Sequence, residues 1–167
     1  MGGGADLNGY DAAGLRAYVD GVRRDPAKAE RNPALTATWV GGSRARVELG
    51  GKVVHIGGDD EYSAMQILLA ALAACDVEVV TTHATLLGVP IRALHIEARG
   101  HFTVQRLFGL SEAPAPGYDD ISYVIHLDAP TATPQQRGLL MEMCERASPV
   151  GDSLGRAIPL RLEFTTG

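Results

Sequence analysis

Residues 63–87 read SAMQILLAALAACDVEVVTTHATLL, and this stretch decides the fold. Its composition predicts one long helix, which Gly88 stops and Pro90 keeps from resuming. At about 1.5 Å per residue the helix would be about 38 Å long, a length that suits a central core helix. Its strongly apolar part, residues 65–75, ends at Asp76 and is well short of the roughly 20 residues that a membrane span needs. We therefore expect a buried helix and no membrane insertion.

Elements on both sides of this helix are predicted from hydrophobic periodicity. Apolar and polar residues alternate in short runs, and glycine pairs between the early runs indicate hairpin turns. The expected strands span 35–39, 44–49, 52–56, 94–104, 121–127 and 158–164, and the other helices span 11–24 and 134 towards 148, with a helical turn at 152–156. Because the strands come in hairpin runs rather than βαβ units, the predicted fold class is α+β with antiparallel sheets.

Composition excludes several kinds of protein. The 167 residues carry 15 basic and 20 acidic side chains, a formal charge of −5, which argues against nucleic acid as a partner. Two cysteines are too few for a disulfide-stabilised secreted domain, but enough for thiol chemistry in a reducing compartment. Residues 1–6 lack the basic and apolar regions of a signal peptide, so we expect a cytoplasmic location.

Motifs for common cofactors and metals are absent from the sequence. There is no glycine-rich phosphate loop, no H-E-x-x-H and no C-x-x-C. The five histidines are scattered, and His95 and His101 would lie roughly 20 Å apart on one strand, too far to share an ion. We therefore expect surface histidines, no metal site and no cofactor.

Cys75 lies near the middle of the predicted central helix and admits two interpretations. A free cysteine in an apolar helix is commonly a small buried hydrophobic residue. A nucleophilic role requires a thiolate, and the helix dipole cannot supply it about twelve residues into the helix. A cation from another segment, such as an arginine, would have to stabilise it, while Glu78 would raise the thiol pKa.

Two motifs resemble those of the OsmC/Ohr family. Residues 65–75, MQILLAALAAC, resemble the family's cysteine helix, and residues 144–150, CERASPV, resemble its second motif, in which a cysteine precedes Pro-Val. The resemblance covers residues 34–165 of a single domain spanning 1–167, with 1–33 as an N-terminal extension that contains a helix. It implies an OsmC-like α+β fold with antiparallel sheets around the central helix, in an intertwined homodimer with two thiol sites at the interface.

The resemblance also implies an activity. In active family members a reactive cysteine reduces organic hydroperoxides, a second cysteine resolves the sulfenic acid, and a dithiol such as protein-bound lipoamide restores the thiol. Cys75 matches the reactive cysteine, and Arg44 resembles the activating arginine, with Arg46 as a competitor on the same strand face. The position of the second cysteine is occupied by Ser148.

Two further positions depart from the family pattern. In the family, a glutamate that precedes the reactive cysteine pairs with the activating arginine. In this chain the corresponding position is Gln66 or Met65, and Glu61 could replace the glutamate only by a different approach. Cys144 lies one turn before Ser148 and is either a displaced resolving thiol or a packing residue. The apolar loop 107–110 either lines a pocket for an alkyl hydroperoxide or contacts a sheet end or a dimer partner.

The predicted function is therefore thiol-dependent reduction of organic hydroperoxides through Cys75, without the usual resolving cysteine and with an external dithiol reductant. The alternative is a non-peroxidase dimer of the same fold that binds a small apolar ligand or serves another thiol role. Ser148 and the missing glutamate favour the alternative, whereas the cysteine helix and Arg44 favour the peroxidase.

Overall fold

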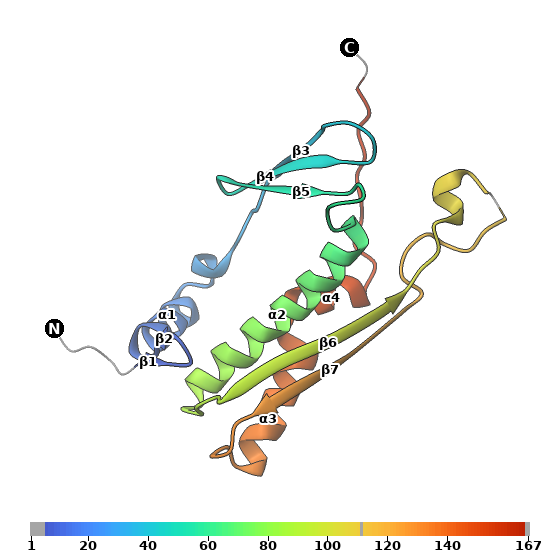
Figure 1. Cartoon of the computed structure of the whole chain (residues 1–167). Coiled ribbons are helices and arrows are strands. Elements are labelled where there is room, and N and C mark those ends of the chain that lie inside the picture. Colours follow the sequence, from blue (N-terminus) through green and yellow to red (C-terminus); the bar gives the residue numbers. More distant parts are fainter. Residues whose placement is uncertain (1–5, 111, 166–167) are drawn as a thin grey trace.

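The long helix expected at the centre of the fold is present. A computed structural model describes residues 6–110 and 112–165, and in it α2 (Ala64–Leu86) lies between the other helices and a hairpin (Figure 1). α2 begins with a capping box: Ser63 Oγ accepts from the Gln66 N–H at 3.2 Å, and Gln66 Oε1 accepts from the Ser63 N–H at 2.9 Å. The chain leaves the helix at Gly88, whose φ of +69° favours glycine.

One long hairpin and two helices pack against α2 and form the core. β6 (Ala93–His101) and β7 (Asp120–Asp128) are antiparallel, and α3 (Pro134–Ala147) is followed at once by α4 (Pro149–Gly155). One buried cluster joins Val79 and Val80 of α2 to Cys144 of α3, with aliphatic side chains of the hairpin against it. A second cluster lies next to it, towards the C-terminal end of α2, and contains Ala84, Val89, Ala129, Ala132 and Leu140.

The three early strands form a separate antiparallel sheet. Its order is β3 (Leu35–Trp39), β4 (Ala45–Leu49) and β5 (Lys52–Ile56), as the glycine pairs predicted. In Figure 1 this sheet lies beyond the N-terminal end of α2. Several of its apolar side chains are exposed in the single chain, among them Leu35, Trp39, Val53 and Val54.

The N-terminal segment docks on the far end of α2 through a hairpin that the sequence patterns did not predict. β1 (Asp6–Leu7) and β2 (Tyr10–Asp11) are joined by Asn8 and Gly9, both with positive φ, and lead into α1 (Ala12–Arg24) and the 3₁₀ helix η1 (Pro26–Ala29). The Asn8 amide donates to the carbonyl of Val89 at 2.9 Å, and its oxygen accepts from the Ile91 N–H at 2.8 Å.

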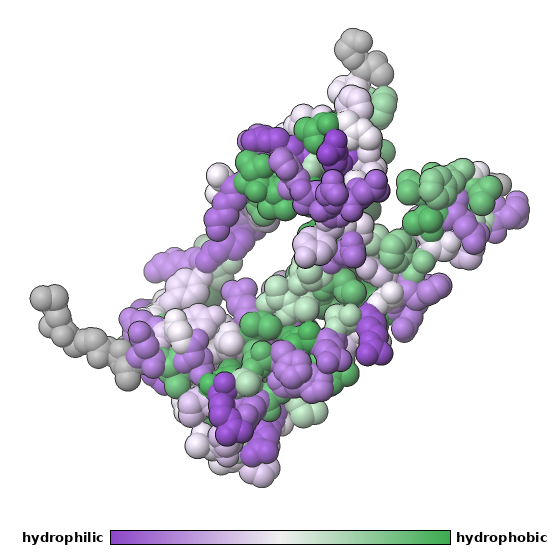
Figure 2. Space-filling view, in the orientation of Figure 1, coloured by the Kyte–Doolittle hydropathy of each residue, from purple (hydrophilic) through white to green (hydrophobic). Residues whose placement is uncertain are grey.

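The predicted last strand, 158–164, is wrong for the described chain. Residues 156–165 are extended but unpaired, and Leu160, Leu162 and Phe164 are 93%, 89% and 86% exposed. A strand needs a neighbour to accept its backbone hydrogen bonds, and none of the described strands pairs with this segment. The loop predicted before β7 contains the 3₁₀ helix η2 (Gln105–Phe108), where Figure 2 shows apolar side chains gathered on the surface.

The fold class is confirmed as α+β with antiparallel sheets. By length and composition alone, α2 would also be long enough and apolar enough to cross a membrane. In the structure it packs against α1, α3, α4 and β6, and 22% of its apolar 18-residue window is buried within the single chain.

Candidate functional site

Cys75 and Ser148 meet although they lie on different helices. The Ser148 hydroxyl donates to Cys75 Sγ at 3.5 Å and accepts from the Gly151 N–H at 3.2 Å. Ser148 is only 3% exposed, whereas Cys75 is half-buried. Pro149 at the first position of α4 fixes this geometry, because it ends α3 and leaves Ser148 as the capping residue of α4. The second-motif position is therefore held directly against the candidate nucleophile.

A cavity of about 220 Å³ opens beside the Cys75 thiol, between α2 and the start of α4. Its lining residues are Cys75, Glu78, Val79, Thr82, His83, Ala147 and Pro149. Glu78 is the acidic residue of this lining. Burial lowers the pKa of His83, so that its ring is neutral at neutral pH. Among the described residues that line the cavity there is no arginine, and the cation that a Cys75 thiolate requires does not come from this lining.

The two candidate arginines lie in the separate three-stranded region, Arg46 on β4 and Arg44 in the turn before it. Arg44 precedes β4, and its aliphatic stem packs against Gly58, where an added Cβ would come within 2.8 Å of Arg44 Cγ. Arg46 is ion-paired with Glu48 on the same strand. Within one chain the structure brings neither arginine into the cavity beside Cys75. Unlike Arg46, Arg44 has no ion-pair partner among the described residues.

The residues near the family's glutamate position have local structural roles. Gln66 is the third residue of the capping box of α2, with its amide oxygen bonded to the Ser63 N–H. The carbonyl of Met65 accepts from the Tyr118 hydroxyl at 2.7 Å. Glu61 is exposed in the turn between β5 and α2. None of these three residues lines the Cys75 cavity.

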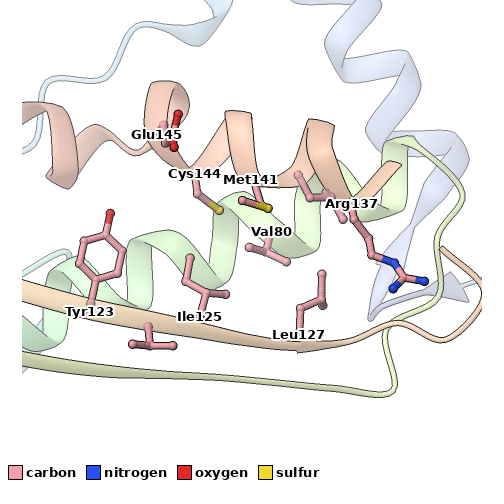
Figure 3. Close-up of a pocket in the computed structure, with 10 residues that line it drawn as sticks. Val80, Tyr123, Ile125, Leu127, Arg137, Met141, Cys144 and Glu145 are labelled. Atoms are coloured by element: carbon pink, nitrogen blue, oxygen red, sulfur yellow. The ribbon is translucent and has the colours of Figure 1, made fainter. Parts of the chain in front are cut away.

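Cys144 faces a different cavity from Cys75. It is buried on α3 against Val79 and Val80, and burial, followed by the charge of Asp76, raises the pKa of its thiol to about 11. Figure 3 shows Cys144 pointing from α3 towards Val80 and β7. The structure thus places Cys144 as a packing residue in a site where the thiolate is strongly disfavoured.

This second cavity is the larger one, at about 510 Å³ (Figure 3). It lies between α3 and β7 and has a mainly aliphatic wall, with Arg137 and Glu145 as its charged residues. Its lining residues are Val80, Tyr123, Val124, Ile125, Leu127, Arg137, Leu140, Met141, Cys144 and Glu145. The apolar loop 107–110 lines neither this cavity nor the one at Cys75, and Leu107 and Phe108 are exposed.

Asp76 is a buried charged residue that the sequence patterns did not single out. It follows Cys75, is fully buried, and neither carboxylate oxygen has a hydrogen-bond partner among the described residues. Burial and then the charge of Asp76 raise the pKa of Tyr123. The signal in the sequence is the acidic residue that interrupts an otherwise apolar helix, which marks an energetically costly position.

Solved structures with the same architecture define the class of protein. An OsmC-like protein from Mycoplasma pneumoniae aligns with a TM-score of 0.64 and 14% identity over 75% of this chain and 89% of that chain. An organic hydroperoxide resistance protein, OsmC, from Legionella pneumophila aligns with a TM-score of 0.53 and 13% identity over 75% and 90%. An organic hydroperoxide resistance protein from Elizabethkingia anophelis, solved with thiocyanate bound, aligns with a TM-score of 0.53 and 15% identity over 75% and 89%. These likenesses establish an OsmC-type fold.

The sequence itself gives the family. The profile described as OsmC-like protein matches residues 57–163, which include both Cys75 and Ser148. The chain belongs to the OsmC-like protein family, as the two cysteine-helix and Pro-Val motifs predicted. A search of curated protein sequences finds no match to this chain.

Proposed function

We propose that the protein reduces organic hydroperoxides with Cys75 as its single reactive thiol. The observation that carries the proposal is the 3.5 Å contact between Ser148 Oγ and Cys75 Sγ, because it brings the two family motifs together at one half-buried thiol. Family membership and two similar structures titled organic hydroperoxide resistance proteins support the same chemistry. The protein would then act in peroxide defence in the cytoplasm, as one domain spanning residues 1–167.

The chemistry requires three steps. The Cys75 thiolate attacks the distal oxygen of ROOH, the O–O bond breaks, and a proton completes the alcohol ROH while Cys75 becomes a sulfenic acid. An external dithiol then attacks the sulfenic sulfur, releases water and forms a mixed disulfide. Its second thiol displaces Cys75 as a thiol and leaves the reductant as a disulfide. Ser148 cannot take the resolving role of a thiol, so both reducing equivalents come from the external dithiol, of a lipoamide-like kind.

We also propose that the activating arginine comes from the second subunit of a homodimer. Arg44 has no ion-pair partner among the described residues, whereas Arg46 is paired with Glu48. The sheet next to Arg44 leaves apolar side chains exposed, and so does the segment 158–164. A second copy that covers these surfaces would explain both the exposed residues and the missing cation at Cys75.

A steady-state assay with cumene hydroperoxide and dihydrolipoamide tests the activity. We expect turnover in the wild type, loss of at least a hundredfold in Cys75→Ser, and nearly unchanged turnover in the matched control Cys144→Ser. Equal turnover in the wild type and Cys75→Ser would overturn the proposal.

The larger cavity favours a second candidate function, the binding of a small apolar ligand. Its volume of about 510 Å³ and aliphatic wall are typical of small-molecule pockets. Met141 lies at the exposed edge of this cavity, so the larger side chain of Met141→Trp would obstruct it (Figure 3). If ligand binding is the function, an apolar fluorescent probe binds the wild type and not Met141→Trp, and Cys75→Ser binds it normally. If the protein is only a peroxidase, Met141→Trp keeps full turnover and the wild type binds no probe.

A further inference from the structure

The hairpin register brings together histidines that lie far apart in the sequence. His95 of β6 is directly opposite His126 of β7, and their rings stack with centroids 4.3 Å apart and an interplanar angle of 11°. Glu97 lies two residues after His95 and therefore on the same face of the hairpin. The sequence prediction of no metal site considered the distance between His95 and His101 along one strand. The pairing of β6 with β7 instead brings His126 next to His95.

From this geometry we propose that His95, Glu97 and His126 form a binding site for a zinc-type divalent cation. One ligand atom from each residue lies within 4.8 Å of the others. Zinc bonds to nitrogen and oxygen at about 2.0–2.2 Å, so two ligands of a tetrahedral ion lie roughly 3.3–3.6 Å apart, and the three side chains must approach one another to bind it. All three side chains are exposed, so the stacked rings have room to rotate until a nitrogen of each turns towards a common ion.

The donor set selects the kind of ion. Two imidazole nitrogens and one carboxylate oxygen suit zinc and its first-row neighbours, whereas calcium and magnesium prefer oxygen ligands alone. Three protein ligands leave one tetrahedral position for water, as in open zinc sites. Because the ligands come from both strands, a bound ion would join β6 to β7 at this point.

Neighbouring charged groups leave these three side chains free. Among the described residues, none of the three has an ion-pair partner, whereas His101 on the same strand pairs with Asp119 at 2.8 Å and Asp128 on β7 pairs with Arg92. The remaining charged residue on this face of β6 is Arg99, two positions beyond Glu97. The opposite face of the hairpin packs on α2, so this site is separate from Cys75.

Zinc titration with a chromophoric chelator as competitor tests the site. Thiols also bind zinc, so the protein carries Cys75→Ser and Cys144→Ser. We expect one ion per chain, at least tenfold weaker binding in His95→Gln or His126→Gln, weaker binding in Glu97→Gln, and unchanged binding in the matched control His101→Gln. Cobalt in place of zinc would give the visible absorption of a bound ion, which His126→Gln removes. An absence of saturable binding, or equal affinity in the wild type, His95→Gln and His126→Gln, would overturn the proposal.

Discussion

Cys75 and Cys144 differ in exposure and in their surroundings. Cys75 is half-buried beside a cavity and accepts a hydrogen bond from Ser148, whereas Cys144 is buried among valines. Burial and the charge of Asp76 raise the pKa of Cys144 to about 11, so its thiolate is scarce at pH 8.

Alkylation of the native protein is therefore expected to be selective. Brief treatment with iodoacetamide at pH 8 should label Cys75 while Cys144 stays largely unlabelled, because a buried thiol with a raised pKa is a poor nucleophile. Peptide mass spectrometry measures both sites in one sample, and labelling after denaturation is the control. Equal labelling of the two cysteines in the native state would contradict this assignment.

The variant Ser148→Cys tests the contact between positions 75 and 148. The contact of 3.5 Å between the serine oxygen and Cys75 Sγ is close enough for a small rotamer change to reach the bond length of about 2.05 Å in a disulfide. We expect one equivalent of cumene hydroperoxide to produce an intramolecular disulfide between Cys75 and the introduced thiol. Non-reducing peptide mapping detects it. In the wild type, which retains Cys144, no such disulfide should form, and an introduced thiol that stays free after peroxide would contradict the geometry.

At the scale of helices and strands, most of the fold follows from local sequence patterns. Glycine pairs and alternation predict β3, β4 and β5, and the Thr133–Gln136 pattern predicts the capping box that starts α3. The strand predicted at 158–164 is wrong. Alternating apolar and polar residues indicate that one face of a segment can be buried, but they do not provide the partner strand that a sheet requires.

The same limit explains what the sequence missed at the candidate sites. The family motif predicts that position 148 meets Cys75, but nothing local predicts which cavity Cys144 faces. Similarly, the long connection between β6 and β7 leaves their register open, so the pairing of His95 with His126 appears only in three dimensions. Contacts between distant segments depend on register and packing, which periodicity within one segment does not fix.

The β1–β2 hairpin yields a prediction about stability. Asn8 has a φ of +53° and connects the N-terminal segment to Val89 and Ile91 near the end of α2. Asn8→Ala removes these hydrogen bonds and places a less tolerant residue at positive φ, so we expect a loss of about 1–3 kcal/mol in the free energy of unfolding. Urea denaturation measures it, with the exposed Asn32→Ala as a control that should change little. Equal stability of the two variants would show that the hairpin is not held by Asn8.

At the scale of the whole molecule, the exposed apolar residues of the three-stranded sheet and of segment 158–164 favour a homodimer. If Arg44 acts on Cys75 of the second subunit, Arg44→Gln should lose roughly a hundredfold in turnover, because a cation next to the reacting thiolate is removed. Arg46→Gln is the matched control and should keep most of its activity, since Arg46 pairs with Glu48.

Subunit complementation tests whether the arginine that acts on Cys75 comes from the same subunit or from the second subunit. Cys75→Ser and Arg44→Gln homodimers should both be inactive, whereas a co-expressed heterodimer contains one complete site if Arg44 acts across the interface. Activity in purified, doubly tagged heterodimers is therefore expected. Inactive heterodimers would mean that arginine and cysteine belong to the same subunit.

The proposed reaction begins with oxidation of Cys75 by an organic hydroperoxide. Its most direct test is to treat the protein with one equivalent of cumene hydroperoxide in the presence of dimedone, which traps sulfenic acids, and to locate the adduct by peptide mass spectrometry. We predict the adduct on Cys75, none on Cys144, and cumyl alcohol released in equal amount. A protein whose Cys75 remains unmodified while the hydroperoxide persists would contradict the claim.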